Sequence, residues 1–145
     1  MLWLMIAALA FDLASVRQEP NPERRSDLAL ENAAAALTEC GQAYKNGDLE
    51  KTRAEASEIE QSVTLSYDSL RETGKDPRRS PKFFKRAELS TRQLVRRLDG
   101  LIESMSMSDR AILLMVRDRV SEIHDELLRI AVASRFATLA PPSSR

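Results

Sequence analysis

The side chains that most often carry out chemistry are scarce in this sequence. One histidine, His124, and one cysteine, Cys40, occur in 145 residues. Zinc sites built from Cys and His, disulfide frameworks and sites with two catalytic histidines therefore lack their components. Di-iron helical bundles need two Glu-x-x-His motifs, whereas Ser121 stands three residues before His124. The sequence also contains no Gly-rich phosphate loop and no Gly-x-Ser-x-Gly motif. We therefore expect no enzymatic activity, no cofactor and no metal.

Cys40 and His124 each have a structural interpretation. Cys40 lies among alanines on the apolar face of an expected helix, and free cysteine is among the most buried residue types. His124 follows the apolar Ile123 and precedes Leu127, which places it at the edge of another apolar face. We expect both side chains to support packing. A reactive or intermolecular thiol and a catalytic histidine are the alternatives.

Carboxylates at helical spacing offer one route to a site for a hard cation, because Ca²⁺ and Mg²⁺ take oxygen ligands. Two sets with i, i+4 spacing occur in the second half of the chain: Asp99 with Glu103, and Asp118 with Glu122 and Glu126. Arg117 and Arg119 are interleaved with the second set, which is typical of a solvated, charge-paired helix face. We therefore predict no metal site, with hard-cation binding as the alternative.

The stretch GKDPRRSPKFFKR, residues 74–86, concentrates positive charge in a chain that has 22 cations and 22 anions overall. It combines helix-breaking residues with the expected start of a helix, where free N–H groups and the helix dipole favour anions. Phe83 and Phe84 are adjacent, so one can enter the core while the other remains closer to solvent. The candidate anion-binding residues are its cations, Lys75, Arg78, Arg79, Lys82, Lys85 and Arg86. Their ligand would be phosphate, an anionic lipid head group or another polyanion.

A second interpretation of the same charge is pairing between helices. Residues 75–97 carry nine cations and two carboxylates, whereas the preceding expected helix, residues 48–73, carries seven carboxylates and three cations. If the two helices are antiparallel neighbours, ion pairs at flanking positions neutralise both faces. We expect this pairing and keep anion binding as the alternative.

The first ten residues, MLWLMIAALA, form an unbroken apolar run. The run is too short to span a bilayer but has the length of a signal-peptide core, and Ala8-Leu9-Ala10 fits a cleavage site. We therefore predict export to the periplasm or secretion, with a mature chain starting near Phe11. No Lys or Arg precedes the run, so an apolar segment that packs on the domain or anchors it to a membrane is the alternative. In that case the protein would be cytoplasmic. Export disfavours a nucleic-acid partner.

The rest of the chain predicts an all-α fold, because aromatic residues make up 5% and Ala, Leu, Glu and Arg dominate. Capping residues and glycines divide it into four segments of similar length, and apolar residues recur every seven positions, as at Leu30, Leu37 and Tyr44. Short connections make neighbouring helices antiparallel. We predict an up-down-up-down four-helix bundle over residues 21–135, after an N-terminal segment (1–20) and before a flexible tail (136–145).

Two stacked hairpins, as in helical repeat proteins, are the alternative architecture. The stretch AYKNGDLEKTRAEA, residues 43–56, resembles the turn of a tetratricopeptide hairpin, and no second copy of it occurs in the chain. Taken together, the residues predict a small exported helical bundle with a non-enzymatic binding or structural role. Its partner would be an unidentified protein or a second copy of the chain, and the alternative function is anion binding by the basic residues named above.

Overall fold

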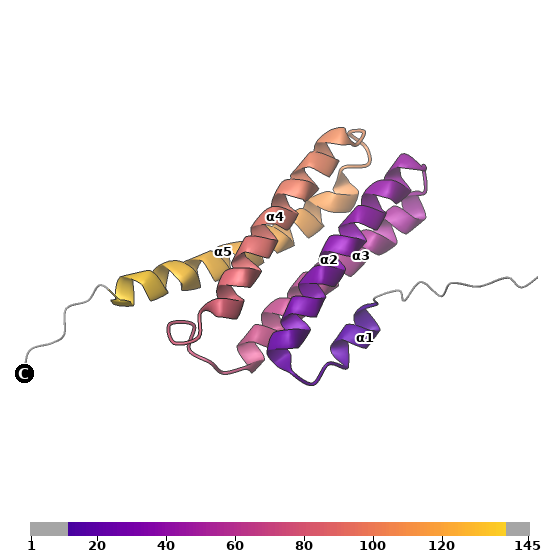
Figure 1. Cartoon of the computed structure of the whole chain (residues 1–145). Coiled ribbons are helices and arrows are strands. Elements are labelled where there is room, and N and C mark those ends of the chain that lie inside the picture. The colour runs from indigo at the N-terminus through magenta and orange to yellow at the C-terminus, as the bar shows by residue number, and fades with distance from the viewer. Residues whose placement is uncertain (1–11, 139–145) are drawn as a thin grey trace, which may run out of the picture.

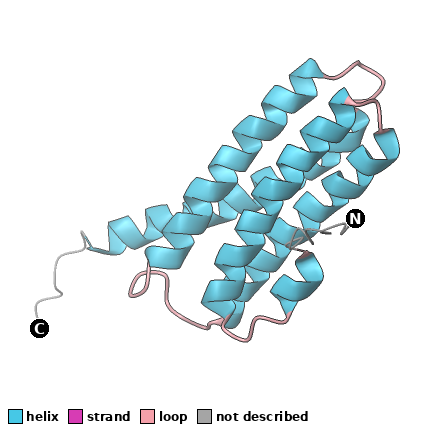
Figure 2. Cartoon of the chain, turned by 45° about the vertical axis from the view of Figure 1, so that its right-hand side comes forward, coloured by secondary structure: helices cyan, strands magenta, loops and turns pink. Residues whose placement is uncertain are grey.

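The structure is a computed structural model that describes residues 12–138. These residues form helices joined by loops, with no strand among them (Figure 2). The five helices are α1 (Leu13–Arg17), α2 (Pro22–Lys45), α3 (Leu49–Glu72), α4 (Lys82–Ser104) and α5 (Ala111–Thr138). The all-α prediction is thereby confirmed for the described part of the chain. The signal-like run and the last seven residues lie outside it.

Capping residues define where the long helices begin and end. The Asn21 side chain accepts hydrogen bonds from two first-turn N–H groups of α2, and Pro22 occupies the first helical position. Asp48 accepts one from the first turn of α3. Gly47 and Gly74 follow α2 and α3 with φ values of 76° and 62°, a left-handed conformation that other residues rarely adopt. The short loop at residues 46–48 turns the chain back, so α2 and α3 run antiparallel, side by side.

Small side chains form much of the contact between α2 and α3. Ala29, Ala33 and Ala36 of α2 are buried, and buried serines come from α3. The hydroxyl groups of Ser26 and Ser66 share a hydrogen bond of 2.7 Å within this contact. Small residues let the two helix axes approach closely, and the bond satisfies the polar groups that this approach buries.

The second pair of long helices completes the core. α4 packs mainly on α5, while α2 also contacts α4 and α3 also contacts α5. Large apolar side chains from all four helices meet there, including Leu37, Ile59, Leu98 and Leu127. Figures 1 and 2 show that the C-terminal end of α5 projects beyond the other helices. No helix in residues 12–138 is both long and apolar enough to cross a membrane.

The short helix α1 was not predicted from the sequence. Its Leu13 and Val16 are buried against α2 and α3, and the Leu13 N–H donates to the Glu58 carboxylate at 3.2 Å. The same Glu58 oxygen accepts from the Asn32 amide at 2.9 Å. A helix of five residues is too short to show a periodic apolar pattern, so its position depends on these tertiary contacts.

Candidate functional site

The start of α4 carries no side-chain cap. Pro81 is the capping residue and lacks a side-chain acceptor. The Ser80 N–H donates to the Asp76 carbonyl at 2.9 Å, which folds the preceding loop into a turn. The first N–H groups of α4 therefore lie among the cations of residues 75–86 without a carboxylate or hydroxyl cap.

Two of the six candidate anion-binding residues face α2. Lys75 forms an ion pair with Glu23, and Arg86 forms one with Asp27. Their partners were expected on α3, and that expectation is wrong, because α4 lies against α2 more extensively than against α3. These two cations are neutralised within the fold. The predicted six-residue cluster is therefore divided.

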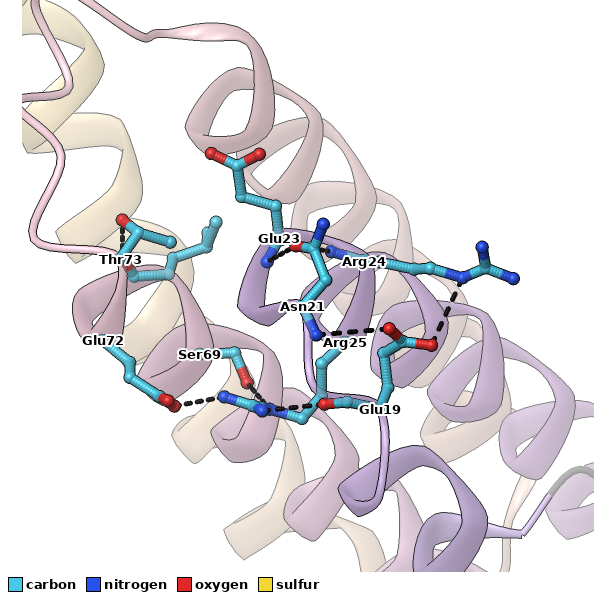
Figure 3. A network of polar contacts seen from close by, with 9 residues as sticks. Glu19, Asn21, Glu23, Arg24, Arg25, Ser69, Glu72 and Thr73 are labelled. Carbon is cyan, nitrogen blue, oxygen red and sulfur yellow. Dashed lines mark hydrogen bonds and ion pairs between the residues drawn. The ribbon is translucent and has the colours of Figure 1, made fainter.

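A polar network at the start of α2 engages part of the acidic charge of α3 (Figure 3). Arg25 of α2 forms an ion pair with Glu72 and donates to the Ser69 hydroxyl at 2.9 Å. It also donates to the Glu19 carbonyl at 2.9 Å, which fixes the chain between α1 and α2. Glu19 in turn pairs with Arg24 at 3.4 Å. Glu72, at the end of α3, thus pairs with a cation of α2 and not with one of α4.

Phe83 and Phe84 separate as the sequence suggested. Phe84 is 7% exposed and belongs to the core, whereas Phe83 is half-buried. The Lys82 ammonium and the Arg86 guanidinium each lie 5.5 Å from the centre of the Phe83 ring. Both contacts have the distance of cation–π interactions. Phe83 therefore holds two cations close together rather than standing alone at the surface.

The other four candidate cations are Arg78, Arg79, Lys82 and Lys85. Within residues 12–138 their side chains form no ion pair. Arg78 and Lys85 line a groove with Arg135 of α5, in the angle between the start of α4 and the end of α5. The groove has a volume of about 490 Å³. Cations from opposite ends of two helices therefore meet here, an arrangement that depends on the tertiary fold.

A buried carboxylate that lines this groove was not identified from the sequence. The Glu88 side chain is 6% exposed, accepts a hydrogen bond from Arg92 Nε at 3.1 Å and lies 3.8 Å from His124 Nδ1. The Thr91 hydroxyl lies 3.3 Å from the same nitrogen and donates to the Ala87 carbonyl at 2.8 Å. Because Thr91 is 1% exposed, this group offers no accessible nucleophile. This group of side chains links α4 to α5 by polar contacts. The i, i+4 spacing of Glu88 and Arg92 was the sequence pattern that could have indicated their ion pair.

Cys40 is fully buried, as expected. Its thiol donates to the Thr52 carbonyl at 3.5 Å. Burial raises the pKa of the Cys40 thiol to about 11, and the negative charge of Glu55 adds to this rise. The thiol is therefore protonated at neutral pH and is a poor nucleophile or metal ligand.

Within the described part of the chain, four of the five carboxylates considered as cation ligands, all except Glu103, form ion pairs with arginines. Asp99 accepts from Arg117 at 2.8 Å, a contact that also raises the pKa of Arg117. Glu122 and Glu126 pair with arginines three residues away on α5, at 3.2 and 2.8 Å. Among residues 12–138 no three His, Cys, Asp or Glu side chains come together as a possible metal site.

Exposed apolar side chains distinguish one half of the molecule from the other. In the described part of the chain, every large apolar residue that is exposed belongs to α4, α5 or the loop between them. They are Leu89, Met107, Leu114, Met115, Leu128, Val132 and Phe136. We call this set the α4–α5 surface. The α2–α3 half has no comparable residue among those described.

Comparison with protein-family models, with characterised proteins and with solved structures finds no match for this chain.

Proposed function

We propose that this is a small exported protein with a non-enzymatic binding role, and that it binds its partner through the α4–α5 surface. In this proposal α2 to α5 constitute an up-down-up-down four-helix bundle to which α1 is added. The α2–α3 pair serves as the rigid half, and the α4–α5 pair presents the binding residues. The partner is another protein or a second copy of this chain.

The observation that carries the proposal is the uneven distribution of exposed apolar side chains. Single exposed apolar residues are ordinary, but all of those described here lie on α4, α5 or the loop between them. Phe136 and Met115 are 69% and 79% exposed, so the fold does not use these side chains for its own packing. Apolar residues that do not stabilise the core and gather on one half of a molecule support a role in binding.

The test is photo-crosslinking in the cells that make the protein. A crosslinking amino acid replaces Met115 on α5 in one variant and the exposed Glu60 on α3 in a matched control. We expect a discrete crosslinked product from position 115 and none from position 60. Equal products from both positions, or none from either, would contradict a binding role for the α4–α5 surface.

Export has its own test, because its signal lies outside the described residues. Protein recovered from cells should begin near Phe11 if the segment MLWLMIAALA is removed. N-terminal sequencing of the cell-envelope and cytosolic fractions gives the answer. A chain that still begins at Met1 in the cytosol would refute export, while leaving the binding surface untouched.

A second candidate function is anion binding by the residues of the 75–86 stretch that lack an ion pair. Arg78, Arg79, Lys82 and Lys85 support it, since four cations near an uncapped helix start attract polyanions. The assay is binding to polyphosphate in a salt titration, with the fourfold Gln variant as comparison. Affinity should fall with salt and should be lost in the variant. Binding that does not depend on salt, or no binding, removes this candidate.

A further inference from the structure

The groove between the start of α4 and the end of α5 has a different character at its two ends. α4 and α5 run in opposite directions here, so the first turn of α4 lies beside residues 128–135 of α5. Arg78, Lys85 and Arg135 line the end next to the loop. Leu89 and Leu128 line the other end, one to two turns further into each helix. The two ends of the groove thus differ in charge.

Charges within the groove are unbalanced. Arg92 is neutralised by Glu88, the one carboxylate among the residues that line it. Arg78, Lys85 and Arg135 form no ion pair with any described residue. Three uncompensated cations are therefore gathered at one end, although cations repel one another at short range. A ligand with negative charge at that end would relieve the repulsion.

Most of the remaining lining is apolar and partly open to solvent. Leu89 is 48% exposed and Leu128 is 39% exposed, while Phe84 forms part of the groove wall. Covering these side chains with an apolar chain stabilises a complex by about 25 cal/mol for each Å² of apolar surface removed from water. The volume of about 490 Å³ lies within the range of roughly 300–1,000 Å³ that is usual for ligand sites.

We propose that this groove binds one molecule of an anionic amphiphile, a ligand with a single acidic head group and an apolar chain. The head group lies between Arg78, Lys85 and Arg135, and the chain extends along Leu89 and Leu128. This inference rests on the proposed binding role and gives the ligand class for one part of the α4–α5 surface.

The alternatives fit the groove less well. Free phosphate would satisfy the cations but would leave the apolar end exposed. An acidic amphipathic helix carries charge along its whole length, whereas the uncompensated cations lie at one end. A bilayer surface is flat or convex and cannot fill a concave groove. Charge at one end and apolar surface at the other match an amphiphile in both position and sign.

The test is calorimetric titration of the full chain with dodecanoate below its micelle concentration. Probes of the two ligand parts are acetate and inorganic phosphate for the head, and the uncharged monododecanoyl glycerol for the chain. We expect saturable binding of dodecanoate with one molecule per chain. Acetate, phosphate and monododecanoyl glycerol should each bind at least about tenfold more weakly, because each lacks either the chain or the charged head group, and losing one contact to a charged group has about this effect.

Matched variants locate the site. Lys85→Gln with Arg135→Gln removes two head-group contacts and should weaken dodecanoate binding at least about tenfold, since each charge-assisted bond is strong. Arg96→Gln is the control, an exposed α4 cation outside the groove. Leu128→Ser should weaken dodecanoate binding about tenfold through lost chain contact. Leu114→Ser should not, because Leu114 is similarly exposed on the same helix but lies outside the groove.

Several results would overturn the proposal. No binding of dodecanoate, equal binding of the uncharged analogue, or equal affinity in the groove and control variants would each do so. Binding to anionic vesicles but not to monomeric dodecanoate would show a membrane surface as the ligand and would also overturn it. If dodecanoate fails while position 115, which lies outside the groove, still crosslinks to a partner in cells, the ligand class is wrong and the binding role stands.

Discussion

Replacing Asn32 with Ala tests the polar contact that joins α1, α2 and α3. Asn32 is 3% exposed, and its amide donates to the Glu58 carboxylate at 2.9 Å and to the Ser62 hydroxyl at 2.8 Å. Glu58 also accepts from the Leu13 N–H. The Asn32 side chain therefore positions the carboxylate that holds the start of α1.

The expected loss of folding stability follows from the two hydrogen bonds that Asn32→Ala removes. The bond to the carboxylate contributes about 1.5–3 kcal/mol and the bond to the hydroxyl about 0.5–1.5 kcal/mol. Alanine recovers up to about 0.7 kcal/mol through its higher helix propensity. The free energy of unfolding of Asn32→Ala should therefore fall by about 1.5–4 kcal/mol.

Urea unfolding followed by circular dichroism measures this change. Glu31→Ala is the control, because Glu31 is the exposed neighbour of Asn32 on the same helix. The Leu13 amide should also exchange its hydrogen faster in Asn32→Ala. A loss below about 0.5 kcal/mol, no larger than that of a typical surface substitution, would show that the contact does not support α1 and α2 as described.

The remaining predictions concern three other side chains. Cys40, whose pKa is raised to about 11, should not react with iodoacetamide at about pH 8 in the native protein but should react in urea. Mass spectrometry measures the labelling, and labelling of the native protein would contradict the burial of Cys40. The Tyr44 hydroxyl donates to Asp109 at 3.1 Å and accepts from the Ser106 N–H at 3.0 Å. The free energy of unfolding of Tyr44→Phe, measured with urea, should therefore fall by about 1–2 kcal/mol. An unchanged unfolding midpoint would be inconsistent with these contacts. Burial and neighbouring carboxylates raise the pKa of Glu55. Above that pKa the charged carboxylate destabilises the folded protein, and this destabilisation disappears as the pH falls and the group becomes protonated. Glu55→Gln should therefore stabilise the protein at about pH 7 with a gain that shrinks toward about pH 4, and a gain that grows on acidification would be evidence against this sign.

Sequence patterns were sufficient for the long helices because their signals are local. Asn21 and Pro22 mark the start of α2, and the glycines at positions 47 and 74 mark the ends of α2 and α3. Capping, proline geometry and left-handed glycine each act within a few residues. The apolar repeat then identifies the buried face of each helix without knowledge of its neighbours.

Helix neighbours were harder to predict, because charge patterns do not specify which helix lies beside which. Lys75 and Arg86 pair with α2, although the more acidic α3 precedes α4 in the chain. Packing of apolar faces decides the arrangement, and exposed ion pairs, worth about 0–1 kcal/mol each, form with whatever carboxylate is then near. Glu23 and Asp27 are those carboxylates.

The candidate site depends on contacts between distant residues, and a single sequence does not reveal them. Arg135 lies within the helical domain predicted from the sequence, and no motif around it indicated a binding site. It joins Arg78 and Lys85 because α5 returns along α4, fifty residues later in the chain. The partial exposure of Leu128 and Val132 likewise depends on how α5 packs against α4, which the sequence of α5 alone does not specify.

Hydrogen exchange of the last turns of α5 tests the central claim most directly, that the α4–α5 surface is covered by a binding partner. Residues 128–136 are compared with residues 60–68 of α3, in protein isolated gently from its own cells and in the same protein after its partner is removed. The α5 segment should exchange at least about tenfold more slowly with the partner present, and the α3 segment should not change. Equal exchange of the α5 segment in both samples would contradict the account.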